Sequence, residues 1–167
     1  MKQSETLKSI HYQTLKINKM ELDMYLSKRT YIGNEYRKPE DKIKIENPKL
    51  SSVNVDKITY ITENVGYWRK ANAIHGWFVN EVQEGNDNCK EYRVDKDDFK
   101  KLLVIIKKIL KEPSSAKKLL PTYEGFFFGS YEYDKYYIED LEYTKKLLEE
   151  IIAKNDDYGE YYYQSSW

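Results

Sequence analysis

A thirteen-residue stretch, residues 66–78, constrains the fold more than any other part of this sequence. It reads GYWRKANAIHGWF and combines two tryptophans with histidine, asparagine, arginine and lysine. Read at 100° per residue, its apolar side chains recur at i, i+4, i+7 and i+11, which predicts an amphipathic helix that packs on a core and ends near Gly85. This apolar stripe consists of Tyr67, Ala71, Ile74, Phe78 and Val82.

The edge beside this stripe carries polar groups, which is unusual for a helix that serves only for packing. Asn72 and His75 cost free energy when they are buried without partners. Arg69 and Lys70 would stand in the first helical turn, where basic side chains oppose the helix dipole unless an anion is present. The edge therefore predicts a site for an anionic, aromatic ligand, stacked on Tyr67, Trp68 or Trp77 and contacted by His75.

The same side chains also have a purely structural interpretation. A single histidine on a helix is commonly a hydrogen-bonded core residue, and tryptophans at helical spacing commonly pack in the core. The residues that we predict as ligand contacts are Tyr67, Trp68, Arg69, Lys70, Asn72 and His75.

The flanking segments predict both strands and helices. Alternating apolar and polar residues predict strands over 21–32 and 57–65. We also expect a short strand over 91–94 and a strand over 161–167 that ends in an aromatic anchor. Three consecutive phenylalanines between two glycines, in residues 125–130, predict a strand that is buried on both faces. Helical periodicity predicts helices over 99–110, after an acidic cap at Asp95 and Asp98, and over 136–154. Residues 114–120 predict one or two helical turns.

The length of 167 residues suits one domain with one hydrophobic core. We therefore predict a single α+β domain over 1–167, with a mainly antiparallel sheet of about four strands and about three helices. Residues 1–20 lack a clear pattern and form a loosely packed arm in this interpretation. Residues 34–56, rich in charge and proline, predict a long loop that could contain a short strand near 42–45.

The composition narrows the classes of partner. Lys plus Arg and Asp plus Glu both number 28, so no overall charge attracts duplex nucleic acid or a membrane surface. No apolar stretch reaches the ~18 residues of a membrane span, and the first residues lack a signal peptide, which predicts a cytoplasmic protein. The 17 tyrosines either reflect a compositional bias or line a ligand site.

Motifs for covalent and metal chemistry are missing from the sequence. Only His11, His75 and Cys89 could supply nitrogen or sulfur ligands, so we expect no zinc and no cofactor. An oxygen-liganded Mg²⁺ stays open because acidic residues are plentiful, although those at 97–98 are explained by the helix dipole. No nucleophile signature and no glycine-rich phosphate loop are present. The sequence thus favours a binding protein over an enzyme, with no catalytic residue.

Several segments together resemble a widespread family of small proteins encoded by bacteriophages and their hosts. The segments are LDMYL (22–26), KRTYIG (28–33), YWRKANAIH (67–75), WFV (77–79), GFFFGS (125–130) and YYQSSW (162–167). The family includes phage anti-CBASS sponge proteins, which bind cyclic or linear nucleotide second messengers without cleaving them. The resemblance covers 21–167, and residues 1–20 lie outside it.

This resemblance implies a viral immune-evasion protein that sequesters a nucleotide signal in the bacterial host cytoplasm. It implies ligand contacts at the motif residues Trp68, Arg69, Asn72 and His75. Many cyclic dinucleotides are nearly symmetric, which makes a homodimer plausible.

Two other functions remain open from the sequence. One is an enzyme that processes a nucleotide, with His75 as acid or base and Glu63 or Glu81 as its carboxylate partner. The other is a protein that inhibits a host factor through an exposed aromatic surface.

Overall fold

The chain folds into one antiparallel sheet with helices on one side, as predicted for an α+β protein. The computed structural model describes residues 21–154 and 159–167, so the predicted arm over 1–20 lies outside the described residues. The strands and longer helices are β1 (Asp23–Tyr31), β2 (Tyr60–Arg69), α2 (Asn72–Glu81), β3 (Tyr92–Val94), α3 (Lys96–Lys111), α4 (Ala116–Leu119), α5 (Lys135–Ala153) and β4 (Gly159–Ser166). None of these helices is long and apolar enough to cross a membrane.

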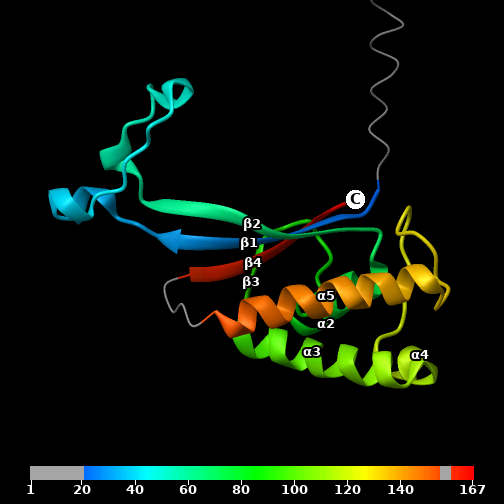
Figure 1. Cartoon of the computed structure of the whole chain (residues 1–167). Helices are drawn as coiled ribbons and strands as arrows, with labels where there is room; N and C mark the ends of the chain where they lie inside the picture. The colour runs from blue at the N-terminus through cyan, green and yellow to red at the C-terminus, as the bar shows by residue number, and fades with distance from the viewer. Residues whose placement is uncertain (1–20, 155–158) are drawn as a thin grey trace, which may run out of the picture.

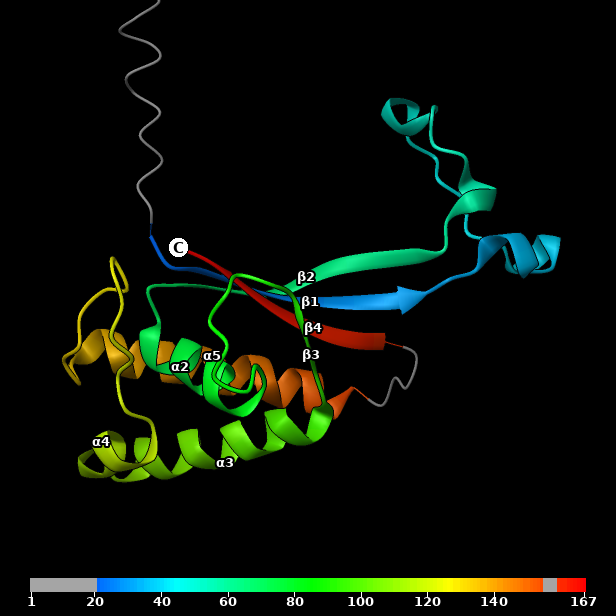
Figure 2. The same cartoon turned by 180° about the vertical axis from the view of Figure 1, so that it is seen from behind.

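The sheet has the strand order β2-β1-β4-β3, with every neighbouring pair antiparallel. The first and last strands of the described chain, β1 and β4, therefore lie side by side in the middle of the sheet. Figures 1 and 2 show that α2, α3 and α5 lie on one face of the sheet, whereas no described element covers the other face.

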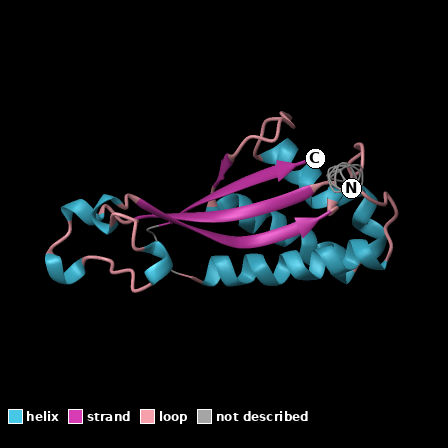
Figure 3. Cartoon of the chain, turned by 90° about the horizontal axis from the view of Figure 1, so that it is seen from above, coloured by secondary structure: helices cyan, strands magenta, loops and turns pink. Residues whose placement is uncertain are grey.

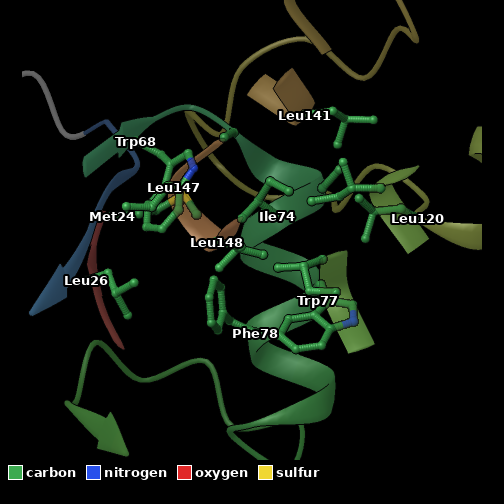
Figure 4. Close-up of a cluster of buried hydrophobic side chains, with 14 of the residues drawn as sticks. Met24, Leu26, Trp68, Ile74, Trp77, Phe78, Leu120, Leu141, Leu147 and Leu148 are labelled. Atoms are coloured by element: carbon green, nitrogen blue, oxygen red, sulfur yellow. The ribbon is translucent and has the colours of Figure 1, made fainter. Parts of the chain in front are cut away.

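The core lies between the sheet and these helices. Alternation along β1 directs Met24 and Leu26 toward the helices and Tyr25 toward solvent. Figure 4 shows Met24 and Leu26 facing Phe78 of α2 and Leu148 of α5. Removing these apolar side chains from water stabilises the fold, at about 25 cal/mol per Å² of apolar surface. Apolar side chains from both layers thus form one continuous core.

The helix predicted from residue 66 begins six residues later, at Asn72. Residues 66–69 instead continue β2, where Gly66 is opposite Leu26 and Trp68 is opposite Met24. Strand alternation therefore buries Gly66 and Trp68 and leaves Tyr67 and Arg69 exposed. A short apolar pattern at a junction fits a helix or a strand equally well, which is why the boundary was predicted wrongly.

The strand predicted over 125–130 is absent, and these residues form a turn between α4 and α5. Phe126 and Phe127 are 79% and 53% exposed, and only Phe128 is buried. The backbone of this turn finds its partners without a sheet, because the Asn72 side chain donates to the carbonyls of Phe128 and Ser130. Phe127 has a left-handed φ of 64°, which is incompatible with an extended strand.

The other helix predictions are confirmed. The α3 helix starts with a capping box, in which the Asp95 side chain accepts from the backbone at Asp98 and the Asp98 side chain accepts from the backbone at Asp95. The helix predicted over 136–154 is α5, and its buried face includes Leu141, Leu148 and Ile151.

The long loop predicted over 34–56 is present, without the short strand considered near 42–45. Figure 3 shows that β1 and β2 carry this loop beyond the layer of helices. Buried Asn34 organises it, since its side-chain Nδ2 donates to the carbonyls of Ile43 and Val55 and its Oδ1 accepts from the Ile43 N–H.

Candidate functional site

A pocket of about 310 Å³ opens where the start of α2, the start of α5 and the turn before α5 meet. This volume lies at the lower end of the range for small-molecule sites. One wall comes from the end of β2 and the first turn of α2, and the opposite wall comes from the first two turns of α5. The residues that line it include Arg69, Lys70, Ala71, Asn72, Ala73, Ile74, Gly129, Ser130, Glu132, Asp134, Tyr136, Tyr137, Glu139, Asp140 and Leu141.

The α2 helix presents an uncapped N-terminus to the pocket. Its N-cap residue is Ala71, which has no side-chain acceptor for the first N–H groups. By contrast, the N-cap of α5 is Asp134, whose carboxylate accepts from Tyr136 N at 2.9 Å and Tyr137 N at 3.2 Å. The first N–H groups of a helix lack intrahelical acceptors and carry partial positive charge. The α2 wall can therefore donate to an anion.

Two cations stand beside this helix end. Arg69 and Lys70 both pair with the carboxylate of Glu21, with Lys70 Nζ at 3.3 Å. Lys70 has a left-handed φ of 62°, and Gly129 lies close to its backbone. A Cβ at Gly129 would lie only 2.9 Å from the Lys70 Cβ, so glycine is needed for the turn to pass this close. The turn therefore helps to hold Lys70 at the rim of the pocket.

The opposite wall carries a carboxylate for which the described residues supply no partner. No described residue forms a hydrogen bond or ion pair with the half-buried side chain of Asp140. Desolvation, and then the negative charges of Glu139 and Asp134, raise the pKa of Asp140 to about 7. Such a carboxylate can accept hydrogen bonds from a ligand or exchange a proton near neutral pH.

An exposed aromatic ring stands one helical turn before Asp140. Tyr136 is 60% exposed, and the Lys135 ammonium group lies 4.7 Å from the centroid of its ring. The cation covers one face of the ring, and the opposite face is available for a planar ligand. Tyr137 points inward instead, where its hydroxyl donates to the Leu120 carbonyl at 2.8 Å.

The structure separates the six residues that were predicted as ligand contacts. Arg69, Lys70 and Asn72 line the pocket, but Arg69 and Lys70 occupy the strand end and the connection rather than a first helical turn. Asn72 is buried, and besides the two carbonyls of the turn its Oδ1 accepts from Tyr123 N at 3.2 Å. Its amide is thus committed to holding the turn that forms part of the pocket.

Trp68 and Tyr67 lie away from the pocket lining. Trp68 is 2% exposed, and its Nε1 donates to Thr144 Oγ1 at 2.8 Å. Tyr67 lies on the open face of the sheet, where its hydroxyl donates to Asp23 and its ring centroid is 5.4 Å from that of Tyr25. The predicted edge of Trp68, Arg69, Asn72 and His75 on one helix does not exist, because a strand and a helix divide these side chains between them.

His75 is completely buried, with both ring nitrogens engaged. Its Nε2 is 3.0 Å from Asp87 Oδ2, and its Nδ1 is 2.7 Å from the Tyr163 hydroxyl. Burial lowers the pKa of His75, against the opposing effect of Asp87. The carboxylate beside His75 is thus Asp87, where the sequence suggested Glu63 or Glu81. A fully enclosed imidazole cannot reach a ligand in the pocket.

The residues that we predicted as ligand contacts did not include Asp140 or Tyr136. A signal was present, because Asp140 lies between the inward-facing positions Tyr137 and Thr144 and directly precedes buried Leu141. An acidic side chain next to the buried stripe of a helix needs a partner or a function.

No group of three or more His, Cys, Asp or Glu side chains within residues 21–154 and 159–167 is arranged to hold a metal ion. Comparisons with protein-family models, curated proteins and solved structures gave no match to the chain. The function is therefore inferred from the pocket and its side chains.

Proposed function

We propose that the protein binds and sequesters a nucleotide second messenger in the pocket between α2 and α5, without cleaving it. The observation that carries this proposal is that the two walls of the 310 Å³ pocket present different chemical groups. The α2 wall offers cations and helix N–H groups, and the α5 wall offers an exposed aromatic ring and a carboxylate without a partner among the described residues. A nucleotide has a phosphate, a flat base and a donor-bearing base edge that match these groups.

The phosphate belongs at the α2 wall in this proposal. The N–H groups of Ala73 and Ile74 stand in the first turn of α2, and Lys70 lies beside them. A phosphate there accepts charge-assisted hydrogen bonds and exploits the helix dipole. Glu21 holds the two cations in the structure described, so the phosphate competes with that carboxylate for Lys70.

Binding without cleavage requires only tight association with the ground state of the ligand. If the protein is instead an enzyme, His75 is enclosed and cannot be its acid or base. Asp140 is the better candidate, because its pKa of about 7 suits a general base. The two functions share the same pocket and differ in what happens to the ligand.

Retention of intact ligand separates these functions. Purified protein is incubated with a panel of cyclic and linear dinucleotides, desalted and heat-denatured, and the released nucleotides are identified by mass spectrometry. Intact nucleotide supports sequestration, a processed nucleotide supports the enzyme, and no retained nucleotide overturns both.

Lys70→Gln tests the placement of the phosphate. The variant keeps a polar side chain at the rim but removes its charge, and we expect about tenfold weaker binding of a retained nucleotide. The matched control is Lys90→Gln, at an exposed lysine outside the pocket. Equal affinities of both variants would contradict the proposed phosphate position.

We include a homodimer in this proposal, because a nearly symmetric cyclic dinucleotide fits a site repeated about a twofold axis. Light scattering with and without cyclic dinucleotide measures the mass directly. A monomer under both conditions overturns the dimer and leaves the sequestration proposal in place.

A further inference from the structure

The Asp140 carboxylate limits which ligand groups can bind beside it. It lines the pocket, is half-buried, and has no hydrogen-bonding or charged partner among the described residues. An ionised carboxylate only accepts hydrogen bonds, and it binds best to two parallel donors that match its two oxygens. The ligand must therefore bring adjacent N–H groups to this wall.

Hydrogen bonds of buried side chains in the core fix the position of Asp140. Thr144 Oγ1 donates to the Asp140 carbonyl at 2.6 Å and accepts from Trp68 Nε1 at 2.8 Å. This chain links α5 to β2 through buried side chains, so the helical turn that carries Asp140 cannot easily shift. A preorganised acceptor binds its ligand at a smaller entropic cost than a mobile one.

We propose that the nucleotide bound in this pocket carries a guanine base, recognised by Asp140 through the ring N1–H and the exocyclic amino group. This proposal rests on the proposed nucleotide-binding function. Guanine presents these two donors side by side on its Watson–Crick edge. Adenine and cytosine place an acceptor beside their amino group, and uracil places its single donor between two acceptors. Guanine alone among the common bases matches a carboxylate with both of its donors.

The neighbouring side chains suit the rest of a guanine nucleotide. Tyr136 and Asp140 are four residues apart on α5 and therefore share one helix face. The ring face of Tyr136 that Lys135 does not cover can stack on the purine. The phosphate then extends to Lys70 and the α2 N-terminus on the opposite wall. Base edge, base face and phosphate thus each have one partner.

Binding should strengthen as the pH rises from 6 to 8, since two donors need the ionised carboxylate and Asp140 has a pKa of about 7. Cations on the facing wall favour the ionised form, whereas neighbouring carboxylates oppose it. The charged groups that line the pocket with Asp140 are Arg69, Lys70, Glu132, Asp134 and Glu139.

Matched ligands test the base preference by calorimetry on the full chain at pH 8. The probes are GMP, IMP and AMP, together with the cyclic dinucleotides that contain two guanines or two adenines. IMP lacks the amino group, so we expect it to bind about tenfold more weakly than GMP, and AMP about a hundredfold or more. Comparable affinities for guanine and adenine ligands overturn the guanine proposal alone. Failure of every probe to bind overturns the proposed function as well.

Asp140→Asn sharpens the test because an amide offers one donor and one acceptor, which suits adenine better than guanine. We expect guanine ligands to lose at least about thirtyfold in affinity and adenine ligands to lose nothing or to gain. The control is Glu142→Gln, an exposed carboxylate elsewhere on α5, which should keep the wild-type preference. An unchanged guanine preference in Asp140→Asn, with its melting temperature preserved, contradicts the assignment.

Discussion

His75 and Asp140 are two titratable side chains that the fold treats in opposite ways. His75 is enclosed by the core, with Asp87 on one ring nitrogen and Tyr163 on the other. Asp140 is half-buried at the pocket and has no described partner. Buried polar groups with every partner in place make a core specific, whereas an unpartnered group at a cavity wall is available to a ligand. The comparison therefore supports a structural role for His75 and the proposed role of Asp140 in ligand binding.

The two environments also shift the pKa values in opposite directions. Burial lowers the pKa of His75 and raises that of Asp140, because in each case the charged form is the one that loses hydration. The unfolded state is therefore favoured when His75 gains a proton and when Asp140 loses one. The stability contributions of the two groups must change with pH in opposite senses.

The largest effect is expected from His75→Ala. Removing the imidazole leaves a cavity and deprives both Tyr163 and Asp87 of a buried partner, which should lower the free energy of unfolding by about 3–4 kcal/mol. Denaturant titration measures the loss. A loss below about 1 kcal/mol would show that the buried network matters little to the fold.

Asn72→Ala should come next. Three hydrogen bonds from one side chain hold Tyr123, Phe128 and Ser130, so their loss should cost about 2–3 kcal/mol and speed hydrogen exchange over residues 122–130. Asn80→Ala is the matched control, since Asn80 is exposed at the end of α2. Unchanged exchange in the turn would contradict the role given to Asn72.

Acid should then weaken the fold through His75. Its folded pKa lies below the unfolded value of about 6.5, so its contribution is complete above that pH and is lost as the pH falls through the folded pKa. Unfolding free energies at pH 7.5, 6.5 and 5.5 measure this slope. His75→Gln should flatten it, and an identical slope in the variant would assign the acid sensitivity to other groups.

The smallest effect is expected from Asp140→Asn in the absence of ligand. The folded pKa of about 7 exceeds the unfolded value, so the wild-type contribution is present below about pH 4 and is lost as the pH rises through 7. The variant should therefore be more stable than the wild type at pH 8, by less than about 2 kcal/mol because water screens a half-exposed group. Greater stability of the wild type at pH 8 would mean that the carboxylate has a stabilising partner in the fold.

Long, regular patterns in the sequence were enough to predict most of the fold. The α3 and α5 helices each keep one burial period over 16 and 19 residues, and burial alternates along β4 and at the start of β1. The junction at Lys70 was predicted wrongly because strand and helix periods coincide over so few residues. The turn at Phe126 and Phe127 was missed because two of the hydrogen bonds that hold it come from Asn72, more than fifty residues away along the chain.

The site was only partly predictable. Basic residues beside aromatic ones drew attention to Arg69 and Lys70, and the structure places both at a pocket. Their contact with a ligand stays a prediction. The sequence places Asp140 beside the inward-facing side chains of α5, but its raised pKa depends on tertiary packing and could not be derived from α5 alone.

The loop between β1 and β2 is a separate part of the fold that can be shortened or replaced. Tyr31 and Tyr60 stand directly opposite each other at the end of the strand pair, and the Asn34 hydrogen bonds join the loop to itself. A two-residue Asn-Gly hairpin turn can bridge such a pair. The segment is thus a natural place to shorten the chain or to graft a reporter domain while the sheet, the helices and the pocket keep their positions.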